Sequence, residues 1–409
     1  MDTKKIYLDY AATTPVSKEV LEAMTPYFSK YFGNASEPHQ WGIEAKLGIE
    51  KARSQVAAAL GAKEKEIVFT SCATESINLA HKGLVEGLGA SGKGIGEKPH
   101  IITTSIEHKA VLETCKHLEK LGMAEVTYLP VDKDGLVNVV DVEKAIRPET
   151  VLVSIMFVNN EVGTIEPIQE IGQLVKRVKQ LRITNNQFPI YFHTDATQAI
   201  QSQDCRVDKL GADLLSLTGH KFCAPKGIGA LYVREGIKIK RQQDGGGQES
   251  NRRAGTENVP YIVGLGKAIE ISKSQISNLK SQTEKLRDRL IESVLKIPGT
   301  QLTGHPIKRA PHIASFIIKG VEGESLLLLL NEHGIAVSTG SACNSGTLSP
   351  SHVLTAMGYP PELSHGSVRF SLGKDTTEED IDYVCQILPE VVERLRQIAP
   401  DFSKTYGLK

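Results

Sequence analysis

Short apolar runs alternate with longer amphipathic segments between residues 43 and 234. A strand that is buried on both faces is a continuous apolar run, whereas a helix on a sheet repeats its apolar positions every three or four residues. We expect strands at 66–70, 100–104, 125–129, 151–158, 189–195, 212–218 and 229–234, and helices at 43–60, 74–86, 108–121, 139–146 and 168–181. This alternation predicts an α/β fold with a mostly parallel sheet and helices on both of its faces.

The pattern changes beyond about residue 265, where a charged amphipathic segment (280–296) leads to shorter apolar runs such as 314–319. This change predicts a second, smaller α+β domain, and a chain of 409 residues exceeds one ordinary hydrophobic core. We therefore expect a large domain over 17–270 and a small domain over 271–409, with the N-terminal segment 1–16 packing on the small one.

Two polar side chains follow predicted strands, and ligands of such sheets gather at the carboxyl ends of the strands. Asp195 ends the run "PIYFHTD", and Lys221 follows a strand that ends at Thr218, after Gly219 and His220. A lysine in a buried position is costly unless it is neutral or covalently bound. The alternative is a lysine whose amine extends into solvent along its apolar stem.

A phosphate site is predicted at the start of the helix in "EIVFTSCATESINLA". A strand ends at Thr70, and a helix begins near Thr74 with Glu75 in its first turn. The free N–H groups and positive end of such a helix bind phosphate, although Thr74 taken alone is equally an ordinary helix cap. A strand-end lysine, a strand-end acid and a phosphate cup together are what pyridoxal phosphate requires.

The glycine run "GLGASGKGIG" (87–96) resembles a nucleotide-binding loop but lacks its context. Such a loop leaves a strand and enters a helix, whereas this run follows a predicted helix and precedes a further loop. Gly94 also occupies the position of the Ser or Thr that would bind magnesium. We expect a surface connection here, and a nucleotide-binding regulator that uses residues 87–94 is the alternative from a different functional class.

Composition excludes several classes of protein. Lys plus Arg equals Asp plus Glu at 48 each, so no net charge attracts nucleic acid or an anionic membrane. The longest apolar run, 326–330, is too short to span a bilayer, and no signal peptide is evident. The six cysteines are scattered without a C-x-x-C pair, which indicates reduced thiols, a cytoplasmic location and no metal site. Cys343 differs from the others because its small and polar neighbours predict an exposed loop.

Several long motifs together resemble the cysteine desulfurases of the class V aminotransferase family, which are fold type I pyridoxal-phosphate enzymes. The resemblance runs from "YLDYAATTP" (7–15) to "VRFSLGKDTTEEDID" (368–382) and so covers nearly the whole chain. Between them stand "FTSCATESIN", "EHKAVL", "VNNEVGTIEPI", "HTDATQA", "TGHK", "PKGIGALYVR", "RAGTEN" and "STGSACNSG". The family implies the fold type I architecture, a homodimer and bound pyridoxal 5'-phosphate.

The resemblance also implies roles for individual residues around the cofactor. Lys221 would form its Schiff base, Asp195 would pair with the protonated pyridine nitrogen, and Gln198 would bond the phenolic oxygen. His108 would stack on the ring and transfer protons. The phosphate would be held by Ala73, Thr74, Thr218, Gly219 and His220, with Thr256 reaching it from the neighbouring subunit.

For the substrate, the resemblance implies that L-cysteine becomes L-alanine and that Cys343 accepts the sulfur as a persulfide. Asn160, which also belongs to the cofactor site, and Arg369 would bind the substrate carboxylate, and a guanidinium fork suits a carboxylate. Acceptor proteins such as an iron–sulfur scaffold would receive the sulfur. The alternatives are a selenocysteine lyase and another aminotransferase or lyase that depends on the same cofactor.

Four positions depart from the family pattern. Cys72 stands where glycine is usual, and Cys223 where an aromatic residue is common. We interpret both cysteines as packing residues. Ala35 replaces a usual proline and Lys374 a common arginine, and neither substitution affects the lysine, the aspartate or the loop cysteine.

Overall fold

The computed structural model describes residues 5–89, 98–185, 188–339 and 350–398. Within this part of the chain, a seven-stranded sheet has the order β2-β8-β7-β6-β5-β3-β4. β8 is antiparallel to both of its neighbours, and the other adjacent pairs are parallel. The strands are β2 (Ile67–Thr70), β3 (His100–Thr104), β4 (Glu125–Leu129), β5 (Thr150–Ser154), β6 (Tyr191–Asp195), β7 (Leu214–Thr218) and β8 (Gly229–Val233). The predicted mostly parallel sheet is confirmed.

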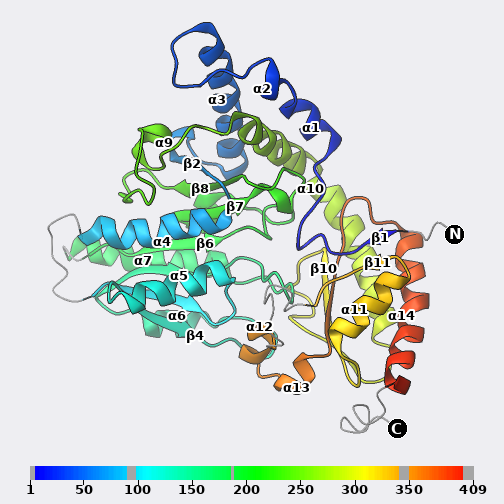
Figure 1. The fold of residues 1–409 in the computed structure, drawn as a ribbon. Helices are drawn as coiled ribbons and strands as arrows, with labels where there is room; N and C mark the ends of the chain where they lie inside the picture. The colour runs from blue at the N-terminus through cyan, green and yellow to red at the C-terminus, as the bar shows by residue number, and fades with distance from the viewer. Residues whose placement is uncertain (1–4, 90–97, 186–187, 340–349, 399–409) are drawn as a thin grey trace.

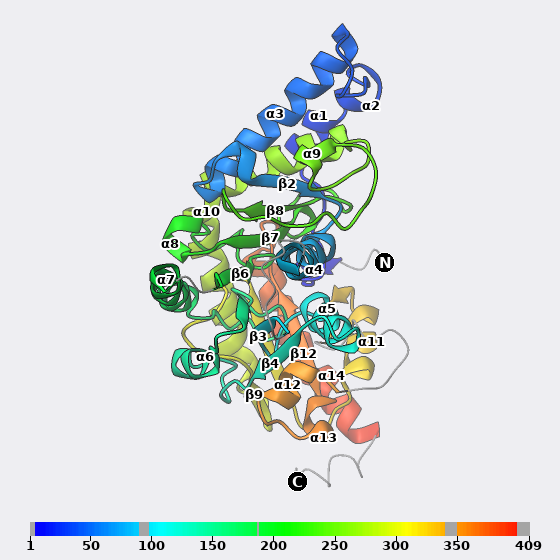
Figure 2. The ribbon, with the colours of Figure 1, turned by 90° about the vertical axis from the view of Figure 1, so that its left-hand side faces the viewer.

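Helices cover both faces of this sheet, as Figure 2 shows. On one face lie α4 (Ala73–Gly89) and α5 (Lys109–Lys120), and on the other α6 (Val139–Ala145), α7 (Ile168–Thr184) and α8 (Val207–Leu210). Each face has its own cluster of buried apolar side chains. Because both faces are covered, β3, β5, β7 and β8 are buried at every position, which explains their continuous apolar runs.

The apolar run 151–158 is longer than the strand it forms, since β5 ends at Ser154. The next residues stay buried although they leave the ladder with β3. Ile155 and Phe157 still donate backbone hydrogen bonds to His193 and Asp195 on β6, at 3.1 and 2.9 Å. Residues 155–158 are therefore buried although β5 ends at Ser154. The apolar pattern indicates which residues are buried, not where the strand ends.

The C-terminal part contains a three-stranded antiparallel sheet of order β12-β10-β9. Its strands are β9 (Thr300–Leu302), β10 (Ile313–Ile318) and β12 (Ser367–Ser371), packed with α11 (Gly323–Glu332) and α14 (Glu378–Ile398) (Figure 1). β1 (Ile6–Tyr7) pairs in parallel with β11 (Ile335–Ala336), and Ile6 and Leu8 join the apolar cluster of this part. The N-terminal segment thus contacts C-terminal elements.

The predicted helix 280–296 is the end of a much longer one, α10 (Val259–Val294). Asn258 caps its start by accepting the N–H of Tyr261, and Pro260 occupies its first turn, where the missing N–H costs nothing. The helix packs on α3 (Gln40–Leu60) and further along on α14 (Figure 1). It runs through the boundary predicted at 270/271, and the two-domain division stays a prediction.

The remaining helices are short. They are α1 (Lys18–Met24), α2 (Pro26–Ser29), α9 (Gln248–Asn251), α12 (His352–Ala356) and α13 (Pro361–Ser364). Among the described residues, no helix has the length and apolar character needed to cross a membrane. The same residues contain no cluster of three or more His, Cys, Asp or Glu side chains arranged to hold a metal ion.

We expect the free energy of unfolding to fall as the pH drops from about 6.5 to 4.5. Burial lowers the pKa of His81 and of His100 to about 4, and that of His312 to about 3. Each histidine binds a proton in the unfolded chain but not in the folded one as the pH falls below 6.5, so the folded state loses stability.

Burial raises the pKa of Glu107 to about 8 and also raises the pKa values of Glu161 and Glu166, so the folded state holds protons that the unfolded chain lacks, which opposes the loss. Burial lowers the pKa values of His193 and His220 as well, so the histidines outnumber these carboxyl groups and the net effect is a loss of stability.

Urea unfolding at pH 7, 6 and 5 measures this dependence. For His81 alone, the difference between the folded and unfolded pKa values corresponds to about 3 kcal/mol when the pH is below both. His81→Gln should flatten the slope of free energy against pH, whatever it does to the stability at pH 7. An unfolding free energy that is constant between pH 6.5 and 4.5 would contradict the prediction.

Candidate functional site

A cavity of about 370 Å³ lies at the carboxyl edge of the parallel strands. It collects polar residues that follow β2, β3, β5, β6 and β7, because parallel strands end at one edge of the sheet. Of the residues singled out in the sequence, Ala73, Thr74, His108, Asn160, Asp195, Gln198, Thr218, His220, Lys221 and Arg369 line it. Fold topology thus brings together side chains that are widely separated in the sequence.

Lys221 reaches the cavity from the short 3₁₀ turn Gly219–Lys221 that follows β7. Its Nζ donates hydrogen bonds to the carbonyl oxygens of Ala11 and Ala12, at 2.7 and 2.8 Å. The turn leaves no space for a side chain at Gly219, since a Cβ there would lie 2.7 Å from the Cβ of Ala224, and the predicted phosphate contact of Gly219 stays a prediction. The lysine is therefore held at the strand end, as the sequence predicts, and close to the N-terminal segment.

Asp195 and His108 face the same cavity from two different strand ends. Asp195 ends β6 and is only 6% exposed, with its Oδ1 accepting the N–H of Thr197 at 2.9 Å. The Nδ1 of His108 accepts the N–H of Ala110 at 3.1 Å and so caps α5. Burial lowers the pKa of His108, and the charge of Asp195 opposes this shift. Because Nδ1 accepts the hydrogen bond from Ala110, it carries no proton. His108 is therefore neutral, with its proton on Nε2.

The N-terminus of α4 forms one wall of the cavity, at Ala73 and Thr74. The first N–H groups of a helix have no partner within the helix, so they suit an anion. Burial lowers the pKa of His220 to about 4, which leaves this side chain neutral at neutral pH. Thr218 already donates its hydroxyl proton to the carbonyl of Ile228 at 3.0 Å, so it can only accept from a ligand in this arrangement.

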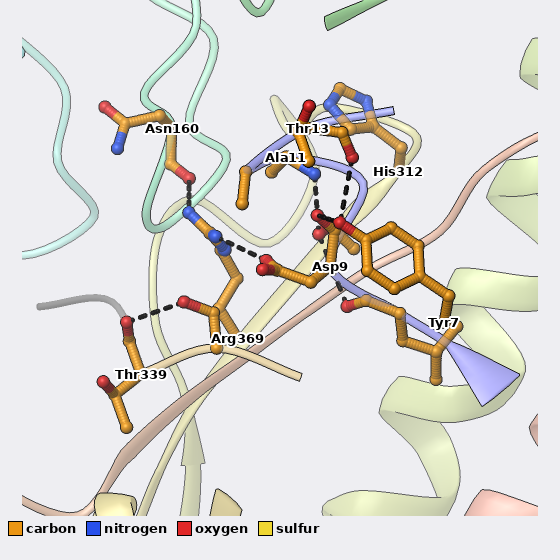
Figure 3. A network of polar contacts seen from close by, with 12 residues as sticks. Tyr7, Asp9, Ala11, Thr13, Asn160, His312, Thr339 and Arg369 are labelled. Carbon is orange, nitrogen blue, oxygen red and sulfur yellow. Dashed lines mark hydrogen bonds and ion pairs between the residues drawn. The ribbon is translucent and has the colours of Figure 1, made fainter. Parts of the chain in front are cut away.

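Arg369 and Asn160 also meet at the cavity, as Figure 3 shows. Arg369 lies in β12 and contacts the backbone oxygen of Asn160, rather than its amide side chain, at 2.7 Å. The second partner of Arg369 is the carboxylate of Asp9, at 2.8 Å. The sequence does not suggest this pair, since 360 positions separate the two residues.

Thr256 is not part of this cavity. It lines a separate hollow of about 120 Å³ together with Ser71 and Arg253. Cys343 lies outside the described residues, whereas Ser338, which precedes it in the chain, does line the main cavity. The roles predicted for Thr256 and Cys343 therefore stay predictions.

Sequence reasoning missed Glu107, the neighbour of His108 in "EHKAVL". Its carboxyl group is fully buried and accepts the N–H of Met156 at 2.9 Å and the hydroxyl of Thr104 at 2.8 Å. Burial raises the pKa of Glu107 to about 8. A carboxyl group that stays protonated at neutral pH adds no full negative charge beside Asp195.

The two cysteines that we interpreted as packing residues have different surroundings. Cys72 lines the main cavity and is half-buried, so packing alone does not describe its position. Cys223 lines a smaller hollow of about 110 Å³ and has a φ of 66°, a left-handed conformation that is uncommon outside glycine. All five described cysteines are free thiols.

The glycine run has the context that the sequence predicts on its N-terminal side. α4 continues to Gly89, so Gly87 lies within the last turn of a helix and does not follow a strand. Residues 90–97, which include Gly92 and Lys93, lie outside the described residues. Another hollow, of about 680 Å³, lies between α3 and α10, and none of the residues singled out in the sequence lines it.

Comparisons with known proteins agree with this geometry. Residues 6–384 match the model of the family described as aminotransferase class-V. The chain is 54% identical over 405 residues to a protein named cysteine desulfurase IscS from Methanosarcina thermophila, which covers 99% of this chain and 96% of that protein. It is 50% identical to a protein of the same name from Dictyoglomus turgidum, with 97% of each chain covered.

Solved structures give the same result for the fold. A structure titled NifS-like protein superposes with a TM-score of 0.86 at 39% identity, covering 95% of this chain and 100% of that one. A structure titled SspA in complex with cysteine has a TM-score of 0.76 at 38% identity, covering 90% of this chain and 99% of that one.

Proposed function

This chain belongs to the aminotransferase class-V family, and on that premise we propose that it is a cysteine desulfurase that depends on pyridoxal 5'-phosphate. It would convert L-cysteine to L-alanine and pass the sulfur to Cys343. The observation that carries the proposal is the single cavity that joins Lys221, Asp195, the start of α4 and Arg369. Relatives named cysteine desulfurase support it over nearly the full length of the chain.

The chemistry of the cavity wall fits the cofactor. Lys221 would bind it covalently through Nζ, the buried carboxylate of Asp195 would face the ring nitrogen, and Gln198 would bond the ring oxygen. Ala73 and Thr74 at the start of α4 offer a phosphate site. When bound, pyridoxal phosphate would supply an electron sink that lowers the barrier to breaking bonds at the amino-acid carbons.

The residues of this chain would then divide the remaining work. Arg369 would bind the carboxylate of L-cysteine through parallel hydrogen bonds, assisted by Asn160. Lys221 would take the proton from Cα through Nζ and return a proton to Cα when L-alanine forms. His108 would move protons near the substrate sulfur, because its cap to Ala110 keeps it neutral with its proton on Nε2.

Cys343 would act as the nucleophile, for which its thiolate form is required. Its sulfur would attack the sulfur of L-cysteine, so that an S–S bond forms and the Cβ–S bond breaks. The electron pair of the broken bond would remain on Cβ, which gains a proton to give L-alanine. Ser338, which stands five positions before Cys343 in the sequence, lines the cavity, and this supports the proposed role.

The proposal includes a homodimer in the cytoplasm that delivers sulfur to acceptor proteins such as an iron–sulfur scaffold. Because Thr256 lies away from the cavity within one chain, a contact with the cofactor phosphate requires a second copy. Exposed apolar side chains on α1, α2 and α3 give such a copy a surface to cover, and they include Leu21, Phe28, Trp41 and Leu47.

The test is the reaction itself. Purified protein loaded with pyridoxal phosphate should absorb visible light, release L-alanine from L-cysteine, and carry one additional sulfur atom on the peptide that contains Cys343. Alanine is quantified by chromatography and the persulfide by mass spectrometry. Absence of visible absorbance together with saturable nucleotide binding would instead favour a nucleotide-binding regulator.

A further inference from the structure

We propose that Asp9 is a positioning residue for substrate binding, which holds Arg369 in the orientation that meets the carboxylate of the amino-acid substrate. This inference rests on the proposed function, because it takes an amino acid as the ligand of the cavity. Both side chains line the cavity, and Figure 3 shows them side by side.

Arg369 is a buried cation that needs a counter-charge. Its side chain is only 6% exposed, and the carboxylate of Asp9 is its partner in an ion pair, from Nη2 to Oδ1 at 2.8 Å. Its Nη1 donates to the backbone oxygen of Asn160 at 2.7 Å. Two different nitrogen atoms of the planar guanidinium are thereby fixed, which sets the plane of the group.

The guanidinium keeps donors for a ligand after these two contacts. It has five N–H groups, and its Nε is buried without a hydrogen-bond partner among the described residues. Nη1 and Nη2 each keep a second N–H group, from which a substrate carboxylate can accept. Asp9 and Asn160 occupy part of the fork and leave the rest for the substrate.

Asp9 itself is held by the backbone around it. It pairs with Ser371 at the end of β12, where Ser371 donates its N–H to Leu8 at 2.7 Å. Ala11 donates its N–H to the hydroxyl of Ser371 at 2.9 Å. Because Arg369 belongs to the same strand, the carboxylate and the guanidinium are carried by backbone segments that are paired with each other.

Among the described residues, Glu161 also interacts electrostatically with Arg369, and it is a weaker counter-ion. Its carboxyl group is engaged by the hydroxyl of Ser351. Burial raises the pKa of Glu161, and Arg369 only partly offsets that shift. The direct contact and the charge therefore both assign the role of counter-ion to Asp9.

The experiment measures kcat and KM for L-cysteine in cofactor-loaded Asp9→Ala, Asp9→Asn, Arg369→Ala and the double variant Asp9→Ala/Arg369→Ala. For Asp9→Ala we expect KM to rise about tenfold and kcat to change by less than about twofold, because binding is lost without loss of the reacting groups. Asp9→Asn should recover most of the affinity, since its amide oxygen accepts the same hydrogen bond from Nη2. In the double variant, KM should be no higher than in Arg369→Ala alone.

A second readout does not depend on turnover. Calorimetric binding of L-alanine, which has a carboxylate, should weaken about tenfold in Asp9→Ala, while binding of cysteamine, which has none, should be unchanged. Tyr7→Phe is the matched control. It removes the hydroxyl that donates to the backbone oxygens of Asp9 and Thr13 on the same segment, and it leaves the Asp9–Arg369 pair in place. KM should stay at the wild-type value in this variant.

The inference is overturned if Asp9→Ala leaves KM unchanged, or if its effect persists in full in the Arg369→Ala background. Equal weakening of L-alanine and cysteamine, or a raised KM in Tyr7→Phe, would also overturn it, because either result indicates a general loosening of the segment. Failure of the proposed function looks different. The wild-type protein would then release no L-alanine from L-cysteine, and the inference would fall with it.

Discussion

Replacing Cys343 by alanine is expected to lower the formation of L-alanine from L-cysteine by about a thousandfold or more, because an alanine methyl group cannot attack sulfur. The variant should still bind the cofactor and L-cysteine, since those steps use Lys221, Asp195 and Arg369. Visible absorbance spectra measure both kinds of binding, and chromatography measures the alanine. Activity on L-selenocysteine should decrease less, because selenium leaves carbon more readily than sulfur.

Cys385→Ala is the matched control for this variant. Cys385 is a half-buried thiol in the C-terminal part, next to a cluster of apolar side chains away from the cavity, and burial raises its pKa. It should retain full activity, and in wild-type protein given limiting L-cysteine the extra sulfur should map to Cys343. Full alanine formation by Cys343→Ala, or an extra sulfur on Cys72 or Cys223, would contradict the assigned mechanism.

Replacing Lys221 by alanine is expected to abolish both covalent attachment of the cofactor and measurable turnover. The loss should exceed about a thousandfold, because the amine serves as covalent anchor and as base. Borohydride reduction followed by peptide mapping should place the cofactor on Lys221 in the wild-type protein and nowhere in the variant. Size-exclusion chromatography should show that the variant keeps the oligomeric state of the wild type.

Lys226→Ala provides the comparison, since Lys226 is an exposed lysine close by in the sequence. It should keep the reduced cofactor on Lys221 and normal turnover. A label on Lys226, or turnover by Lys221→Ala near the wild-type rate, would refute the role given to Lys221.

The sequence allows the strand-end residues of the site to be predicted, because the signal there is local. Asp195 is the last residue of an apolar strand, and Lys221 follows another strand after one short turn. The helix that starts with Ala73 and Thr74 comes directly after β2. An apolar run followed by a polar residue marks the edge of a buried sheet, whatever the rest of the chain does.

The extents of some elements could not be predicted in this way. Residues 155–158 are as apolar as β5 because they are buried, and apolarity does not distinguish a paired strand from a buried crossing segment. The first half of α10 is similarly hidden, because it packs on α3 and therefore lacks the charged pattern that marks residues 280–296. In both segments, the apolar pattern depends on the elements that pack against the segment rather than on the secondary structure that the segment forms.

The sequence alone determines local order along the chain, through burial and periodicity. This local order comprises which segments are strands, which are helices and which polar residues end them. The pairings between distant residues were decided only by the tertiary structure. Asp9 reaches Arg369, and the carbonyl of Ala11 reaches Lys221, because the N-terminal segment lies along β12 and crosses the edge of the main sheet. A hydrogen bond or an ion pair depends on distance in space, and no periodic pattern records a distance between residues that are hundreds of positions apart.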